Sequence, residues 1–229
     1  MASKSKAGKT GARTAGAAKA KAAKAKAAKA QATGSKVTKA KSPAAASFLK
    51  AFGPGEPYRP FTGADDARLG DRIPGVMRAI LGREGWCSYK GQVLWLCDPD
   101  DWRPAARAWF PGSARARVLA RTGFGDLCVW DGRMFYFAMV HESIVMEMVD
   151  DAGLFFSFVL SDRDFAPQSY LPERVRAARE RAGPLAWDEM YTHVPALALG
   201  GSVESSRIER VKAPEALAML AGLAPIRRL

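Results

Sequence analysis

The sequence is poor in the residues that enzymes and metal proteins use for chemistry. Its 229 residues include two histidines, His141 and His193, and three cysteines, Cys87, Cys97 and Cys128, whose spacing matches no metal-ligand pattern. An odd number of cysteines without an export signal indicates reduced, buried thiols rather than a disulfide framework. No apolar run approaches the ~18 residues that cross a bilayer. We therefore expect a soluble, cytoplasmic protein without a membrane segment.

Neither histidine belongs to a catalytic motif. His141 lies in an expected hairpin turn beside Glu142, and His193 precedes an apolar segment. Either could in principle act as a general base, but no nucleophile elbow accompanies them and no second ligand stands at metal spacing. The segment from Gly123 to Asp126 also lacks the third glycine and the lysine of a phosphate-binding loop. The sequence therefore favours structural roles for both histidines and predicts no enzyme activity, no cofactor and no metal.

Acidic residues are absent from residues 1–45. Twelve of the chain's 35 lysines and arginines lie there, and the 23 that remain equal the 23 acidic residues. The pI of about 9.9 is therefore a property of this segment. Apart from alanine, its apolar residues are one valine and the first methionine, too few to offset the entropy of ordering the backbone. The composition predicts a disordered, polycationic tail.

The tail contains a lysine comb, KAKAAKAKAAKA. At helical spacing its lysines point in all directions and leave no apolar stripe, which argues against a membrane-surface helix or a coiled coil. A flexible polycation binds phosphate backbones by releasing counterions, without reading sequence. Weak, non-specific DNA or RNA binding and a solvated extension without a specific role both remain open. The candidate nucleic-acid-binding residues are Lys19, Lys21, Lys24, Lys26 and Lys29.

The remaining ~184 residues have the apolar content of one large core or two small ones. Helix signals dominate the first part, with a short apolar segment from Ser47 to Phe52 and helical spacing of apolar residues after Pro74. A short strand, VLWLC, and another helix follow. Because Pro111, Gly112 and Ser113 break the chain, we divide the body into domains at 46–116 and 117–229.

The second domain begins with four strand-like segments, VLARTGF, DLCVWDG, RMFYFAMV and SIVMEMV, joined by turn signals such as Asp131-Gly132. They predict an antiparallel meander. In RMFYFAMV both alternating sets of residues are apolar, so this strand should lie centrally with both faces covered.

Helices should supply the cover. Asp150 or Asp151 is placed to cap one in DAGLFFSFVLS, and a largely solvated helix is expected over 172–182. A buried strand PALALG, a polar strand IERVK and a closing helix over 214–223 complete the chain. The apolar face expected for the first helix consists of Leu154, Phe155, Phe158 and Val159. The fold class is α+β, with a small helix-rich part followed by an antiparallel sheet covered by helices.

Six segments of the body resemble a known two-part bacterial family. They are FGPGEPYRP at 52–60, EGWCSYKGQVLWLCDPDDW at 84–102, ARTGFGDLCVWDG at 120–132, LFFSFVLSDRDF at 154–165, GPLAWDEMYTHVPALALGG at 183–201, and IERVKAPEALAMLAGL at 208–223. The family joins a GAD-like domain to the C-terminal domain of type VI secretion DNase-immunity proteins, and the resemblance covers residues 46–225 in order. It implies a non-catalytic protein that binds and neutralises a cognate toxin, typically a nuclease, in the cytoplasm of the producing cell. A nucleic-acid-associated protein that binds DNA through the tail is the alternative.

An acidic turn precedes one of the expected helices. Asp98 is placed to cap that helix, and the turn lacks the ligand spacing of an EF-hand. Alternatively, its carboxylates form a contact surface, because nuclease clefts are usually basic and aromatic residues dominate interface energetics. The candidate partner-binding residues are Asp98, Asp100, Asp101 and Trp102.

Overall fold

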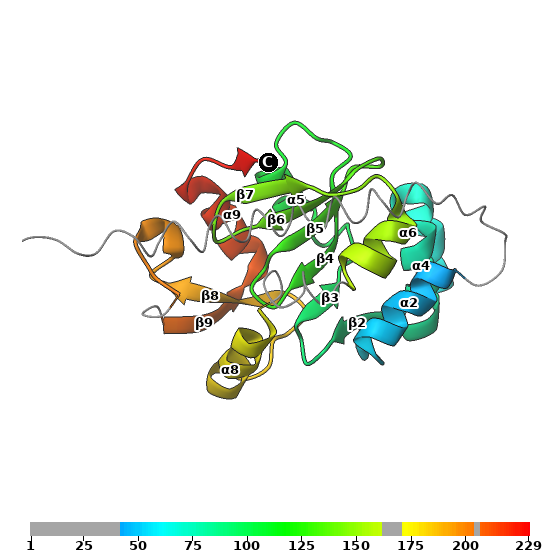
Figure 1. The fold of residues 1–229 in the computed structure, drawn as a ribbon, viewed down its shortest axis with the longest axis horizontal. Helices are drawn as coiled ribbons and strands as arrows, with labels where there is room; N and C mark the ends of the chain where they lie inside the picture. Colours follow the sequence, from blue (N-terminus) through cyan, green and yellow to red (C-terminus); the bar gives the residue numbers. More distant parts are fainter. Residues whose placement is uncertain (1–41, 162–170, 204–206) are drawn as a thin grey trace, which may run out of the picture.

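The computed structural model describes residues 42–161, 171–203 and 207–229. Its centre is an eight-stranded sheet with the strand order β1-β2-β3-β4-β5-β6-β7-β10 (Figure 1). Neighbouring strands are antiparallel, except that the short β10 runs parallel to β7. The strands are β1 (Glu56–Arg59), β2 (Trp86–Tyr89), β3 (Leu94–Leu96), β4 (Arg117–Thr122), β5 (Leu127–Trp130), β6 (Phe135–Met139), β7 (Ile144–Glu147) and β10 (Arg227–Arg228). A second, two-stranded antiparallel sheet pairs β8 (Glu189–Val194) with β9 (Arg207–Lys212).

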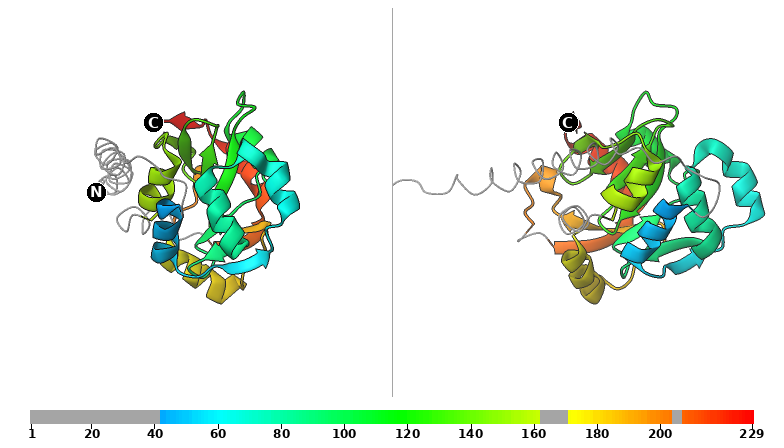
Figure 2. Two further views of the ribbon diagram at one scale, coloured as in Figure 1. Left: turned by 90° about the vertical axis from the view of Figure 1, so that its right-hand side faces the viewer. Right: turned by 45° about the vertical axis from the view of Figure 1, so that its right-hand side comes forward.

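Helices cover both faces of the large sheet, which confirms the predicted α+β class. On one face α2 lies beside α6, and on the opposite face α9 packs with α5 (Figures 1 and 2). The helices are α2 (Pro43–Phe52), α3 (Gly63–Leu69), α4 (Gly75–Glu84), α5 (Arg103–Trp109), α6 (Ala152–Leu154), α8 (Pro172–Ala182) and α9 (Ala213–Leu223). Short 3-10 turns form η1 (Gly70–Arg72) and η3 (Leu197–Leu199), and a π-helical turn, η2 (Phe155–Val159), continues α6. No helix in the described ranges is long and apolar enough to span a bilayer.

The predicted meander is confirmed as β4 to β7. Phe135 and Phe137 of β6 are buried in the core beneath α2 and α6, whereas Ala138 faces the core beneath α5 and α9. The strand is therefore covered on both faces, as its apolar pattern predicts. The sheet continues beyond the meander, because β3 pairs with β4 through Leu94 and Thr122. The predicted division at 116 and 117 stays a prediction about separate folding units.

The first helix begins earlier than expected. Ser42 is its N-cap, with a side-chain oxygen that accepts a hydrogen bond from the backbone N–H of Ala45 at 3.3 Å. Ala45 and Phe48 are buried in the core. Residues 42–46 therefore belong to the folded body, and the five candidate lysines of the tail (Lys19, Lys21, Lys24, Lys26 and Lys29) lie outside the described residues.

The helix after β7 has a different buried face from the one predicted. Asp151 caps it by accepting a hydrogen bond from the N–H of Leu154 at 2.7 Å, as expected. The π turn then replaces the i→i+4 pattern with a bond from the N–H of Leu160 to the carbonyl of Phe155 at 2.8 Å. This extra residue rotates the helix, which buries Phe155, Phe156, Val159 and Leu160 and leaves Leu154 and Phe158 half-buried.

The predicted buried strand PALALG is wrong. The strand is β8, one segment earlier, and it ends at Val194 where Pro195 supplies no N–H for a further ladder bond. The following residues form η3, in which Leu199 is 64% exposed. The polar strand and the closing helix are confirmed as β9 and α9.

Two glycines permit α8 and β8 to approach the large sheet closely. A Cβ on Gly123 would lie 2.9 Å from the carbonyl oxygen of Gln92 and 2.9 Å from a methyl group of Val175 in α8. Gly125 has a φ of +85°, and a Cβ there would lie 2.5 Å from the Met190 side chain of β8. A larger residue at either position would separate β4 and β5 from the elements packed against them.

Candidate functional site

The acidic turn is held by arginines from the preceding segment. Asp98 is 2% exposed and forms ion pairs with Arg59 and Arg68, each at 2.6 Å. Its side chain also accepts a hydrogen bond from the backbone N–H of Asp100. The prediction that Asp98 caps α5 is wrong, because the N-cap residue is Trp102 and no side chain caps that helix. The Asp98 carboxylate is instead the buried centre of an ion-pair cluster.

Asp100 lies at the exposed end of the same cluster. It pairs with Arg68, with Arg72, and with Arg103 at 2.6 Å. Hydrogen bonds from Arg72 hold the pKa of the Asp100 carboxyl well below its usual range, against the opposing effect of burial. Asp101 is exposed, and partial loss of hydration beside the cluster, together with the negative charge of Asp98, raises the pKa of its carboxyl.

The structure thus divides the four candidate partner-binding residues. Asp98 and Trp102 are each 2% exposed, so their side chains contact the interior, and the Trp102 ring lies 5.1 Å from the guanidinium carbon of Arg121. Asp100 and Asp101 reach the surface. Partner binding at this turn stays a prediction, and it now rests on the two surface carboxylates.

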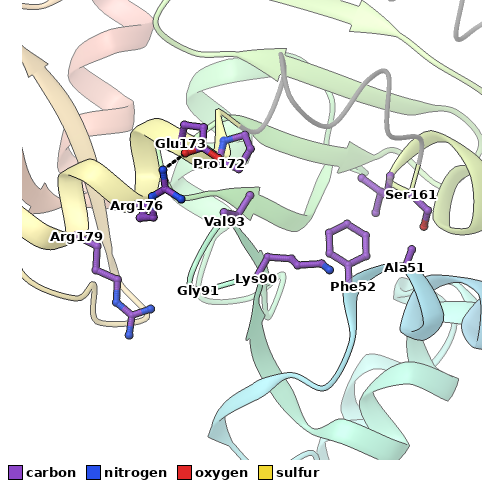
Figure 3. Close-up of a pocket in the computed structure, with 11 residues that line it drawn as sticks. Ala51, Phe52, Lys90, Gly91, Val93, Ser161, Pro172, Glu173, Arg176 and Arg179 are labelled. Atoms are coloured by element: carbon purple, nitrogen blue, oxygen red, sulfur yellow. Dashed lines mark hydrogen bonds and ion pairs between the residues drawn. The ribbon is translucent and has the colours of Figure 1, made fainter.

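A large groove lies elsewhere, on the side of the sheet covered by α2. A groove of about 760 Å³ is bounded by α2, the β2–β3 turn, the end of η2 and the first turns of α8 (Figure 3). Phe52, Val93 and Leu160 supply apolar side chains to it. Its size lies within the range of pockets that hold ligands or anchor side chains.

The polar residues of this groove are mainly cationic. Lys90, Arg176 and Arg179 line it together with one carboxylate, Glu173 (Figure 3). Glu173 pairs with Arg176, whereas Lys90 and Arg179 form no ion pair with any residue in the described part of the chain. The groove therefore carries an excess of positive charge beside an apolar wall, which suits an acidic and partly apolar protein segment.

The β2–β3 turn that forms one wall has an unusual backbone. Lys90, Gly91 and Gln92 have φ values of 54°, 66° and 75°, and the two non-glycine residues pay a conformational cost there. The side chain of Gln92 holds the turn by donating to the carbonyl of Leu185 at 3.0 Å and accepting from its N–H at 2.8 Å. The turn is therefore fixed in place by a segment 93 residues away in the chain.

The two histidines, expected in separate structural roles, lie together. Their ring centroids are 5.2 Å apart, and Nε2 of His141 lies 2.9 Å from the carbonyl oxygen of Phe124. Burial lowers the pKa of both rings to about 4, and the nearby Arg174 guanidinium adds to the shift. Both are therefore neutral at pH 7. No group of three or more His, Cys, Asp or Glu residues in the described ranges could hold a metal ion.

Two protein-family models match this chain. The model described as "GAD-like domain" matches residues 44–141, and that described as "T6SS immunity protein Tdi1, C-terminal" matches residues 152–224. Residues 44–141 therefore form a domain of the GAD-like type, and residues 152–224 form a domain of the Tdi1 C-terminal type, called here the immunity domain. No curated protein matches it. The crystal structure of Atu4351 from Agrobacterium tumefaciens is similar with a TM-score of 0.59 and 20% sequence identity, over 80% of this chain and 90% of that one, which shows a shared fold.

The groove lies between these two matched domains. Lys90 and Val93 come from the GAD-like domain, and Leu160 and Arg176 come from the Tdi1-type immunity domain. The groove as a whole could not be recognised from the sequence, because its residues come from four separate segments. The one local signal was the Lys-Gly-Gln sequence at 90–92, since a left-handed turn favours glycine.

Direct hydrogen bonds join the GAD-like and immunity domains in addition to the Gln92 pair. Trp109 Nε1 donates to the carbonyl of Leu217 at 3.1 Å, and Arg121 donates to the carbonyl of Trp187 at 3.1 Å. Both donors are buried in the core. These buried polar contacts thus fix the GAD-like and immunity domains in one relative arrangement.

Proposed function

We propose that this protein neutralises a protein toxin of the type VI secretion system, a nuclease, by binding it without catalysis in the cell that produces it. The observation that carries the proposal is the match of residues 152–224 to the Tdi1 C-terminal domain. The fixed association of that domain with the GAD-like domain supports it, because a rigid surface loses little conformational entropy when it binds.

The groove between the two domains is our candidate contact surface. Its apolar wall can take an anchor side chain, and Lys90 and Arg179, which form no ion pair within the described ranges, can pair with carboxylates of the toxin. Contact there places the inhibitor on an acidic segment of the toxin rather than in a basic nuclease cleft. Asp100 and Asp101 are the rival surface, since their charge suits the cleft itself.

Co-expression with the cognate toxin, to be sought among the genes beside this one, tests both surfaces. The double variant Lys90→Glu/Arg179→Glu should lose protection and bind the purified toxin at least about tenfold more weakly, because two attractive contacts become repulsive. Arg115→Glu/Arg133→Glu is the matched control, since both arginines are exposed and line no part of the groove.

The acidic turn requires a different substitution from the obvious one. Changing Asp100 would break its three ion pairs, so a loss of protection could reflect damage to the cluster. Asp101→Lys tests the turn without disturbing the ion-pair cluster, because Asp101 is exposed and forms no ion pair among the described residues. If Asp101→Lys abolishes protection and the groove variant protects fully, the toxin binds at the acidic turn and our assignment of the groove fails. If the wild-type protein neither binds the toxin nor protects against it, the immunity function itself is wrong.

The polycationic tail favours a second function, non-specific association with DNA or RNA. Residues 1–45 carry twelve positive charges and no negative ones. Binding through them should weaken steeply with salt, with a log-log slope of about −0.7 to −0.9 per phosphate neutralised. A fragment beginning at residue 42 should lose most of this affinity and retain protection. Equal DNA binding by the fragment and the full chain would show that the tail has no such role.

A further inference from the structure

A second cavity, separate from the groove, is lined by arginines. It has a volume of about 380 Å³ and lies between η1, α5 and the segment that leads into β4. Arg72, Arg103, Arg107 and Arg117 line it together with Ser113, and none of the lining residues in the described ranges carries a carboxylate. We call these four arginines and Ser113 the arginine pocket.

The positive charge of the arginine pocket is only partly balanced. Arg72 and Arg103 pair with Asp100, whose carboxylate they share with Arg68. Arg107 and Arg117 form no ion pair with any residue in the part of the chain that the structure describes. Since unbalanced guanidinium groups repel one another, the folded protein bears a local cost that a bound anion would remove.

The surroundings of Arg117 point to the same conclusion. Its Nη1 donates to the carbonyls of Ala114 and Ala116 at 2.9 and 3.1 Å, which fixes the side chain against the pocket wall. Its Nε is buried without a hydrogen-bond partner among the described residues, and an unsatisfied donor of a charged group is expensive. Burial lowers the pKa of Arg117, and the charges of Arg72 and Arg103 lower it further. The local potential is therefore positive at this side chain.

Helix α5 adds a like-charge pair. Arg103 and Arg107 are four residues apart on one face of the helix, where like charges repel each other, and the ion pair of Arg103 with Asp100 offsets only part of this charge. An arrangement that is unfavourable by itself becomes favourable around an anion. Guanidinium groups match phosphate with paired N–H donors, and a phosphate monoester carries about −1.5 to −2 charges at pH 7, close to the excess from Arg107 and Arg117.

We propose that the arginine pocket binds a phosphate group, held by Arg107 and Arg117 and flanked by Arg72 and Arg103. The site is distinct from the toxin-binding groove and does not depend on the proposed immunity function. Its volume is sufficient for a phosphate and part of the group that carries it. Free phosphate, a nucleotide and a nucleic-acid backbone present the same chemistry.

Isothermal titration of the full-length protein with inorganic phosphate at constant ionic strength tests the site. The wild type should bind saturably, and Arg107→Gln/Arg117→Gln should bind at least about tenfold more weakly, because each lost charge-assisted contact is worth about one decade or more. Arg133→Gln/Arg181→Gln is the control, since it removes the same charge from two exposed residues outside the pocket and should leave the affinity unchanged. The lysine tail is present in all three proteins, so its contribution cancels.

Further titrations identify the source of the phosphate. A nucleoside monophosphate and a short DNA duplex should each show the same dependence on the two pocket arginines if they are ligands. The single variant Arg107→Gln distinguishes a lost phosphate contact from misfolding. Arg107 has no partner in the described structure that folding could require, so this variant should fold normally. Absence of saturable binding by the wild type, or an equal loss in the pocket and control variants, would overturn the proposal.

Discussion

Arg121 offers the sharpest test of how the two domains are held together. It is fully buried, and its guanidinium carbon lies 4.6 Å from the centre of the Trp95 ring and 5.1 Å from that of Trp102. It donates to the carbonyls of Ala186 and Trp187 at 3.5 and 3.1 Å, on the segment that leads into β8. We consider its replacement by alanine and by methionine.

Three effects determine how much each replacement changes the free energy of unfolding. Burial lowers the pKa of Arg121 to about 10 from 12.5, which corresponds to a cost of about 3 kcal/mol for keeping the charge inside. Either replacement removes this cost and leaves the carbonyl oxygens unpaired, at about 1–3 kcal/mol. Alanine also leaves a cavity between the two indole rings, whereas methionine fills most of it. The cavity penalty for a long side chain is about 2–5 kcal/mol.

The two variants should therefore differ in stability. Arg121→Met should have a free energy of unfolding within about 2 kcal/mol of the wild type, because the two shared effects nearly cancel. Arg121→Ala should be less stable than Arg121→Met by about 3 kcal/mol. Urea denaturation followed by tryptophan fluorescence measures both values, since Trp95 and Trp102 flank the site. Equal stability of the two variants would refute the buried stacking arrangement and the packing argument built on it.

Three further predictions concern the folded body. A fragment of residues 42–229 should unfold at the same urea midpoint as the full chain. The fragment 47–229 should have a free energy of unfolding lower by at least about 1 kcal/mol, because it lacks the cap and first turn of α2. Equal midpoints for the two fragments would contradict this. Burial raises the pKa of Asp126 to about 8, whereas the carboxyl ionises near pH 4 in the unfolded chain. The stability of the wild type relative to Asp126→Asn should therefore fall as the pH rises from about 4 to 8. A stability difference that does not change with pH would contradict this. The pKa of His193 is about 4 in the folded state, below its ordinary 6.5, so the unfolded state takes up a proton first as the pH falls. His193→Gln should therefore lose less stability than the wild type between pH 6.5 and 4. An equal loss of unfolding free energy in the two proteins would contradict this.

The parts of the fold that were predicted are those with a local signal. Both faces of β6 are apolar in the sequence, and a capping aspartate precedes α6, so their type and place followed from period and chemistry. The strands β1 and β2 were missed because they are short and lie among strong helix signals. The strand predicted for PALALG failed for the opposite reason, since apolar composition alone does not show which segment is paired.

The candidate sites were harder to anticipate than the fold. The cluster around Asp98 needs Arg59 and Arg68, which are 39 and 30 residues away in the sequence. The sequence alone does not show whether a carboxylate beside an aromatic residue is exposed or buried. The acidic turn was therefore compatible with a contact surface, although Asp98 and Trp102 are buried. The groove and the arginine pocket are assembled from several elements each, so neither could be recognised before the elements were placed.

The segments that resemble the family have structural roles that explain why they mark the fold more clearly than the toxin. Gly123 and Gly125, in ARTGFGDLCVWDG, let α8 and β8 approach the large sheet, and Gln92, in EGWCSYKGQVLWLCDPDDW, pairs with Leu185. Each of these contacts joins the GAD-like domain to the immunity domain. Under the proposed function, this junction would present one rigid surface to the toxin. The proposed partner-binding residues, Lys90 and Arg179, are exposed and take no part in these junction contacts, so we expect that they can be changed without loss of the fold.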